Sequence, residues 1–330
     1  MTLIDWKEKL RPFARASKWR AWIQIANTVL PYLALIMLMG YLMSINVHPL
    51  WIILLSIPTG LFLVRVFILF HDCTHQSFFA SKKWNTIAGY IFGIMTFTPY
   101  RIWQAEHNRH HGAVGNLDRR GTGDVWTMTV EEYVESSGWK RFVYRIYRNP
   151  LFLFLIAPFF LFAVLHRLPS RTFKGGKYFV SRFVTNAALL AIFLLVTFTL
   201  GINYYLLIQL PVLFVASVSG VWLFFIQHQF EEVYWEHHED WDFVKAAIEG
   251  SSFYKLPLVL DWMTGHIGFH HIHHLNSRIP NYRLRQSYRA VQNLKNGKTI
   301  TLLESFKLGL YKLYDEKTGR LVRMRDVKRI

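Results

Sequence analysis

The sequence has little cysteine and little charge, and both shortages narrow the class of protein. Its 330 residues include a single cysteine, Cys73, so no disulfide can form within the chain, which fits a reducing compartment. Only 18% of the residues are charged and 52% are hydrophobic, which is apolar for a soluble protein. The first twenty residues are mixed and basic, and the first apolar run is too long for the hydrophobic part of a cleavable signal peptide.

Motifs for common redox cofactors are also missing from these residues. There is no Gly-x-Gly-x-x-Gly nucleotide fingerprint and no set of cysteines for an iron-sulfur cluster. His48-Pro49 is followed by Leu50 instead of the Gly-Gly of a cytochrome b5 haem motif. Any redox chemistry would therefore need a separate electron donor.

Long apolar runs bounded by positive charge are what the sequence does contain. Four runs are long enough to cross a bilayer as helices, and they cover about residues 22–45, 50–70, 183–200 and 204–227. The formal net charge is +17, and Lys and Arg gather before the first run but not in the turn Asn46–Pro49 after it. Because cytoplasmic loops carry the excess of Lys and Arg, the N-terminus is predicted to be inside. The protein is expected to be a multi-pass protein of the cell (plasma) membrane.

Two shorter apolar runs, 84–100 and 151–165, are predicted to be interfacial or re-entrant. Pro158 interrupts the second run, which has basic loops on both sides. The predicted fold class is all-α, an integral membrane protein with four transmembrane helices and two interfacial or re-entrant apolar helices. A cytoplasmic helical cap of about residues 71–182 and 228–330 would complete one domain spanning residues 1–330 and would hold a histidine-rich dimetal site.

Fifteen histidines are unevenly distributed, and most of them lie in or beside three five-residue windows, 71–75, 107–111 and 270–274. Histidines three or four residues apart share one face of a helix, so each window can aim two or three imidazoles at one point. Imidazole is the commonest side-chain metal ligand, and eight such histidines are enough for two first-row metal ions. Asp72 and Glu106 stand beside candidate ligands and could tune them through hydrogen bonds, or could be ordinary surface charges. A metal pair that binds O₂ can attack the unactivated C–H bonds of lipid chains.

These windows resemble the three histidine boxes of membrane fatty-acid desaturases, most closely the bacterial and cyanobacterial acyl-lipid type. His71-Asp72-Cys73-Thr74-His75 is similar to a first box that commonly reads His-Asp-Cys-Gly-His, and His-x-x-His-His recurs at 107–111 and 270–274. The resemblance covers roughly residues 50–285 and includes the further stretches 227–231, 249–257, 268–275 and 278–282.

The resemblance implies a non-haem di-iron centre with two Fe, consumption of O₂ and insertion of a cis double bond into a fatty acyl chain, with a phospholipid as the expected carrier. It implies a separate electron donor such as ferredoxin or flavodoxin, although the basic surface could instead only bind lipid headgroups. The implied metal ligands are His71, His75, His107, His110, His111, His270, His273 and His274, with His228 after the last span as a ninth.

Other polar residues are assigned less central roles. Asp72 and Glu106 are expected to hold ligands in place, and His266 could do the same, replace a ligand, or be a tolerated neighbour where relatives often have asparagine. His271 is expected to point away from the metals and Cys73 to be a packed thiol. The remaining histidines are expected in loops, at the interface or in solvent, and they are His48, His166, His237 and His238.

Two alternatives to desaturation remain for the function, and a third fails. A lipid hydroxylase or carotenoid ketolase would share the boxes. A membrane metal transporter or sensor would need polar groups along the spans, which are nearly uncharged. A nucleic-acid binder is excluded because the positive charge flanks apolar spans. The sequence does not give the double-bond position, the acyl carrier, the donor or the oligomeric state.

Overall fold

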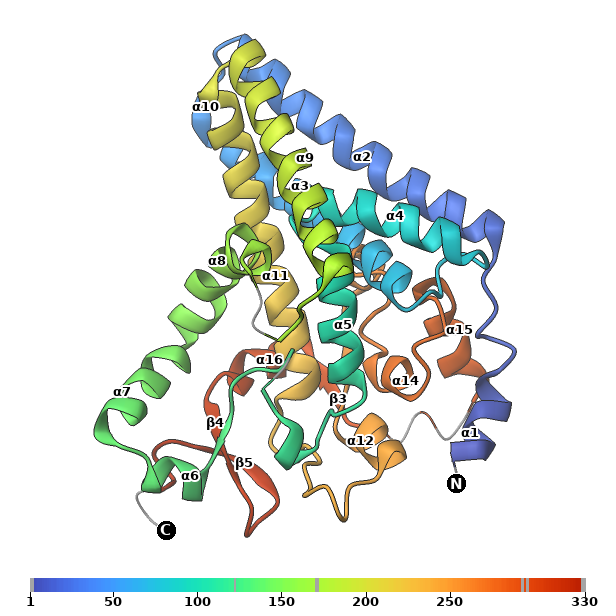
Figure 1. Ribbon diagram of the computed structural model, residues 1–330, viewed down its shortest axis with the longest axis vertical. Coiled ribbons are helices and arrows are strands. Elements are labelled where there is room, and N and C mark those ends of the chain that lie inside the picture. Colours follow the sequence, from blue (N-terminus) through green and yellow to red (C-terminus); the bar gives the residue numbers. More distant parts are fainter. Residues whose placement is uncertain (1–2, 122, 170–171, 292–293, 295–296, 328–330) are drawn as a thin grey trace.

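The computed structural model describes residues 3–121, 123–169, 172–291, 294 and 297–327, and it is mostly helical. Four long apolar helices stand together at one end of the molecule, and the shorter elements form a base below them (Figure 1). The chain runs from the base through these helices and back twice, and both ends of the chain lie at the base.

Within the residues that the structure describes, four single helices are long and apolar enough to span a membrane, which agrees with the predicted number of spans. They are α2 (Lys18–Ser44), α3 (Pro49–Thr74), α9 (Gly176–Leu200) and the continuous segment Ile202–His228. This last segment comprises α10 (Ile202–Tyr204), a π-helical turn (Tyr205–Gln209) and α11 (Leu210–His228). The helix α2 begins before the predicted apolar run because the Ser17 hydroxyl caps it, accepting from the Arg20 N–H.

The two shorter apolar runs are helical but are not among these four spans. The first forms α4 (Lys82–Met95) and, after a turn, leads into α5 (Tyr100–His111). The second forms a π-helical turn (Phe152–Ile156), α8 (Ala157–Ala163) and a 3₁₀ turn (Leu165–Arg167). The segment Phe152–Arg167 is bent by 59° from α7 (Gly138–Tyr147), and together the two are apolar enough to form either a re-entrant loop, as predicted, or a fifth, broken span.

The base also contains two small sheets, so the all-α description holds for the spans but not for every part of the cap. β1 (Met128–Thr129) pairs in parallel with β4 (Tyr311–Asp315), which pairs antiparallel with β5 (Arg320–Arg323), Leu313 opposite Val322. β2 (Phe253–Lys255) pairs in parallel with β3 (Thr299–Thr301). The remaining helices are α1 (Leu3–Leu10), α6 (Val130–Glu135), α12 (Phe243–Glu249), α13 (Leu258–Met263), α14 (His270–Leu275), α15 (Asn281–Ala290), α16 (Leu302–Leu308) and a 3₁₀ turn Leu117–Arg119.

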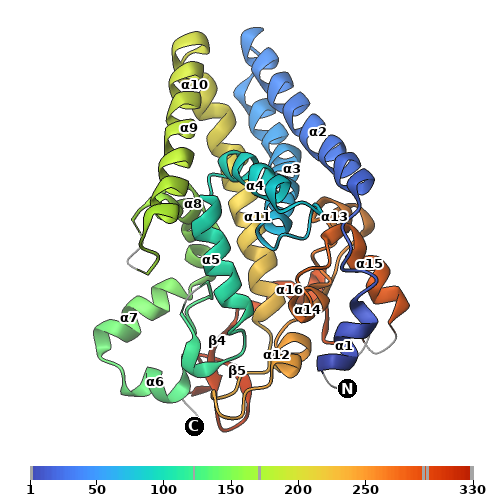
Figure 2. The same cartoon turned by 45° about the vertical axis from the view of Figure 1, so that its right-hand side comes forward.

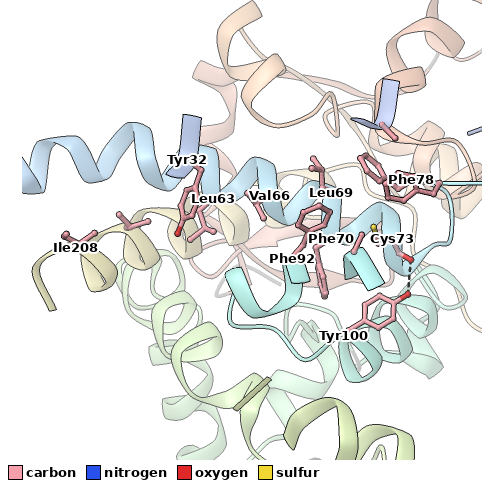
Figure 3. Close-up of a cluster of buried hydrophobic side chains, with 14 of the residues drawn as sticks. Tyr32, Leu63, Val66, Leu69, Phe70, Cys73, Phe78, Phe92, Tyr100 and Ile208 are labelled. Carbon is pink, nitrogen blue, oxygen red and sulfur yellow. Dashed lines mark hydrogen bonds between the residues drawn. The ribbon is translucent and has the colours of Figure 1, made fainter. Parts of the chain in front are cut away.

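The helix α3 is the centre of the packing, and its lower end fixes the first histidine window. Phe70 packs against Tyr100 at the start of α5, and the Tyr100 hydroxyl donates to the Cys73 carbonyl at 3.1 Å (Figure 3). A side chain at Gly89 of α4 would begin 2.2 Å from the Tyr100 ring, so only glycine admits this contact. Cys73 is fully buried in the same cluster, as expected for a packed thiol.

Arg65 lies within the apolar part of α3, above Asp72 and the histidine window, and its charge is paired inward. The Arg65 guanidinium lies 3.9 Å from the centre of the Trp262 ring, and its Nε donates to the Thr28 hydroxyl at 2.9 Å. A second guanidinium nitrogen donates to the Trp262 carbonyl. The cation–π contact and these two hydrogen bonds offset part of the cost of placing this charge in an apolar span, and the contacts with Trp262 tie α13 to α3.

Candidate metal centre

The nine candidate ligands come from four helix segments that meet in the base. His71 and His75 lie at the lower end of α3, and His228 is the last residue of α11. The other two windows lie on α5 and α14, which reach the same region (Figure 2). The structure therefore brings together all three histidine windows, which are far apart in the sequence.

The nine imidazoles form two adjacent groups. In the first group, one ring nitrogen from each member lies within 4.8 Å of all the others, and its members are His71, His75, His107, His111 and His273. The second group, by the same measure, contains His110, His228 and His274. His270 adjoins the second group, with its Nε2 2.9 Å from that of His228 and 3.1 Å from that of His274.

The groups touch each other through His111 and His274. Their rings stack at 4.1 Å between centres, while the His111 Nε2 lies 3.0 Å from the His273 Nε2. Metal ions held by the two groups would therefore be neighbours.

The convergence of these nitrogens fits metal binding better than hydrogen bonding. A neutral imidazole has one donor and one acceptor nitrogen, so several Nε2 atoms that face one another cannot all be satisfied by each other. The Nε2 atoms of His71 and His75 are buried and have no hydrogen-bond partner among the described residues. Burial, reinforced by the neighbouring imidazoles, lowers the pKa of each ring in this set well below its usual value: His75, His107, His111, His270, His273 and His274. Neutral, converging imidazoles are the donor set that a pair of first-row metal ions requires.

Two carboxylates contact imidazoles of the two groups, and only one of these carboxylates was predicted. The Asp72 Oδ1 lies 3.2 Å from the His71 Nδ1. The Asp124 Oδ1 lies 2.5 Å from the His110 Nδ1. Such contacts fix the ring and its tautomer, and they make the other nitrogen a better ligand. Sequence reasoning missed Asp124 because it lies in an irregular loop after the second window, where no periodicity relates it to His110.

Asp72 is held by a chain of polar contacts that reaches the first span. Its Oδ2 accepts from both the backbone N–H and the side-chain amide of Asn281, at 2.7 and 2.8 Å. The Asn281 Oδ1 in turn accepts from the Gln24 side chain of α2 at 2.5 Å. All three side chains are buried. This series of hydrogen bonds positions Asp72, and thereby His71, relative to the membrane helices.

In the described part of the chain, the other two predicted orienting residues make no contact with the imidazole nitrogens of the two groups. Glu106 lies beside His107 and lines a cavity, and among the described contacts it makes no hydrogen bond to a histidine; burial raises its pKa to about 7. The His266 Nδ1 lies 2.7 Å from the Asp261 carboxylate, and no described contact joins it to the nine imidazoles. Its φ of 62° is left-handed, a conformation that asparagine and histidine adopt more readily than most residues.

The histidine inside the third window that was expected to point away does so. The His271 Nε2 lies 2.9 Å from the Leu294 carbonyl, and His271 belongs to neither histidine group. The window therefore supplies three converging imidazoles and one that packs the helix.

A cavity of about 600 Å³ adjoins the first group of histidines. Its wall contains His107, Glu106 and Asp124 at one end, and α3, α8 and α11 supply apolar side chains along its length. Six Phe, Trp and Tyr residues line it: Phe67, Trp103, Tyr147, Phe162, Phe173 and Phe224. Trp103 stacks on His107 at 4.2 Å, whereas Trp126 and Trp262, which also lie near the windows in sequence, are absent from the wall. A volume and lining of this kind suit an apolar ligand.

Replacing Asn281 by alanine is expected to lower metal affinity at the first group about 10–100-fold, the usual cost of losing a group that orients a ligand. Asp72 would keep the hydrogen bond from the backbone N–H of residue 281 but would lose the one from the side-chain amide and, with it, the link to Gln24, so that the carboxylate that contacts His71 would be held less firmly. Metal retained per chain after dialysis against a graded chelator measures the effect. Gln286→Ala, which changes an exposed amide on the same helix, is the control and should retain metal like the native chain. Equal retention by Asn281→Ala would show that Asp72 needs no such support.

Comparisons with known proteins match this chain to desaturases of fatty acids and lipids. The family model described as fatty acid desaturase matches residues 47–298. The chain is 41% identical to a fatty acid desaturase from Bacillus subtilis over 98% of this chain and 91% of that protein. It is 28% identical to an sn-1 oleoyl-lipid 12-desaturase from Picosynechococcus, over 73% of this chain and 70% of the relative. It is 29% identical to an sn-1 acyl-lipid omega-3 desaturase (ferredoxin) from Synechocystis, over 77% of this chain and 70% of the relative.

Proposed function

The chain belongs to the fatty acid desaturase family of oxidoreductases, and we propose that it inserts a cis double bond into an acyl chain of a membrane phospholipid by using O₂ and a di-iron centre. The observation that carries this proposal is the junction of nine converging imidazoles with a largely apolar cavity. The two cyanobacterial relatives are named as acyl-lipid desaturases, which supports a lipid-linked substrate.

The two histidine groups would hold one iron ion each. His71, His75, His107, His111 and His273 would bind the first, and His110, His228, His270 and His274 the second. When bound, the iron pair would supply the activation of O₂ that removal of hydrogen from an unactivated methylene requires. Asp72 and Asp124 hold one imidazole in each group, and therefore fix where the metals lie.

The chain's own residues position the substrate and exclude water. Trp103 and Phe67 are in contact at 5.2 Å and form a rigid wall leading to His107. An acyl chain confined along this wall can present only a short segment to the metals, so the site of desaturation is a matter of position and not of intrinsic reactivity. The apolar lining also keeps bulk water away from the reacting carbons.

Electrons would come from a separate soluble donor on the cytoplasmic side. Forming one double bond with O₂ takes two hydrogen atoms from the lipid, and two further electrons and two protons are needed to reduce O₂ fully to water. The Synechocystis relative is named as a ferredoxin enzyme, and the net charge of +17 suits an acidic ferredoxin or flavodoxin. The basic N-terminal segment and the position of both ends at the base support a plasma-membrane protein whose site faces the cytoplasm.

Lipid analysis of cells that lack unsaturated fatty acids tests the proposal. Cells expressing the native chain are expected to gain monounsaturated acyl chains, whereas cells expressing His110→Ala should gain none. His238→Ala, which removes an exposed histidine outside the metal groups, is the matched control and should act like the native chain. Hydroxylated lipids would instead indicate a sister oxygenase. Unchanged lipids, with purified protein that holds zinc and no iron, would exclude the oxygenase function.

A further inference from the structure

The cavity has a second end, and a continuous aromatic wall leads to it from the metal groups. From His107 the wall passes through ring contacts to Trp103 at 4.2 Å, Phe67 at 5.2 Å, Phe162 at 5.6 Å and His166 at 4.9 Å. All five side chains line the same cavity. His166 therefore lies at the opposite end of this wall from the metal ligands, in the 3₁₀ turn that follows α8.

Polar atoms without partners lie at and beside this second end: His166 is part of the cavity wall, whereas Arg167, the next residue in the chain, and Asn186 are not. The His166 Nδ1, the Arg167 Nε and the Asn186 Oδ1 are all buried and lack a hydrogen-bond partner among the described residues. They belong to one place, because the Asn186 side chain donates to the Arg167 carbonyl at 3.4 Å. Buried polar atoms are rarely left unpaired, and an ionisable side chain among apolar membrane helices is a functional-site candidate.

The surroundings of this end are apolar and open outward. Leu165 and Leu168, which line the cavity beside His166, are 55% and 51% exposed. The Arg167 guanidinium lies 5.6 Å from the centre of the Phe97 ring, and within the described part of the chain no acidic side chain pairs with it. A ligand for this end must therefore combine an apolar chain with oxygen acceptors, at least one of them anionic.

We propose that Arg167 binds the phosphate of a phospholipid substrate and that His166 donates to its acyl ester carbonyl. The acyl chain then follows the aromatic wall to His107. This inference rests on the proposed function and specifies how the same site recognises its substrate. Arginine suits the role because its planar guanidinium matches phosphate geometry and loses less hydration than an ammonium group. With the ester held at one end and the metals at the other, the enzyme would place the double bond at a fixed distance from the ester.

Binding of a saturated, fluorescently labelled phosphatidylglycerol to the purified, iron-loaded full chain in nanodiscs tests the recognition without relying on catalysis. Arg167→Gln is expected to weaken this binding about 10–100-fold, the value of one charge-assisted hydrogen bond. Labelled diacylglycerol, which lacks the phosphate, should bind the native chain and Arg167→Gln equally. His166→Phe, which keeps a ring in the aromatic wall and removes the donor, should weaken binding of both lipids.

Two controls separate recognition from general charge and folding. Lys177→Gln removes an exposed positive charge at the start of α9, outside the cavity, and should bind phosphatidylglycerol like the native chain. Arg167→Lys should recover part of the affinity. Unchanged phosphatidylglycerol binding by Arg167→Gln would overturn the inference. So would an equal loss of diacylglycerol binding in that variant, or displacement of the lipid by millimolar inorganic phosphate, which would identify a free anion as the ligand.

The position of the double bond provides a second readout. The native chain should give one positional isomer, whereas Arg167→Gln should give a mixture, because the ester end is no longer fixed. A single, unchanged isomer formed at the native rate by Arg167→Gln would overturn this inference and leave the desaturase function intact. Failure of the native chain to form any double bond would instead overturn the proposed function.

Discussion

The variant His111→Ala is expected to lose metal from the five-histidine group and to lose desaturation below detection. In the native chain, the His111 Nε2 lies 3.1 Å from the Nε2 of His107 and 3.0 Å from that of His273, and the His111 ring stacks on His274 of the other group. The alanine variant therefore lacks one proposed metal ligand, and it lacks the ring that packs between the two histidine groups. The loss should therefore exceed the roughly 100-fold upper range for residues that only orient ligands. Metal ions per purified chain, together with lipid products, measure the effect.

The control for this variant comes from the third window itself. His271→Gln changes a buried histidine whose ring contacts the Leu294 carbonyl instead of the metal groups, and glutamine retains a donor for that carbonyl. This variant should keep both metals and its activity. Two metals per chain and native activity in His111→Ala would contradict the assignment of the five-histidine group.

Replacing the buried Arg148 by methionine is expected to destabilise the cap and to remove the metal from the second group, called here the four-histidine group because it includes the adjoining His270. The Arg148 guanidinium is 1% exposed and donates to the Trp126 carbonyl, the Thr127 hydroxyl, the Gln229 side chain and the Tyr311 carbonyl, at 2.8–3.3 Å. It thus joins the segment after Asp124, the residue after His228, and the strand β4. Each acceptor left unpaired costs about 1–3 kcal/mol, so the free energy of unfolding should fall by roughly 3 kcal/mol or more.

Metal content distinguishes a positioning role for Arg148 from a purely structural one. The Arg148→Met variant should retain close to one metal per chain instead of two, because Asp124 and His228 both serve the four-histidine group. Arg148→Lys should recover only part of the loss, since an ammonium group cannot reach all four acceptors in the plane of a guanidinium. Thermal denaturation in detergent gives the stability. A variant that is less stable but still binds two metals would mean that Arg148 does not position the ligands.

The spans and the histidine windows could be predicted because both depend on local pattern. An apolar run of sufficient length marks a membrane helix, and imidazoles three or four residues apart face one way whatever surrounds them. The convergence of His71, His107 and His273 followed from the placement of all three windows on one side of the spans.

The supports of the metal site could not be predicted, because they depend on contacts between distant residues. Asn281 meets Asp72 across 209 residues of sequence, and Arg148 meets Tyr311 across 163. The strands β1 and β2 have two and three residues, too short for an alternating pattern to appear. His166 looked like a loop or interface residue, and its place at the end of an aromatic wall depends on how α3, α5 and α8 pack together.

The central claim is that the protein desaturates a lipid acyl chain at two histidine groups beside an apolar cavity. A single turnover of the purified protein tests this claim most directly. The iron-loaded chain is reduced, mixed with a saturated phosphatidylglycerol and exposed to ¹⁸O₂, and the acyl chains are then analysed by mass spectrometry. The account predicts acyl chains that have lost two hydrogen atoms and contain no ¹⁸O. Acyl chains that contain ¹⁸O, or acyl chains that remain saturated while two iron ions are bound, would contradict it.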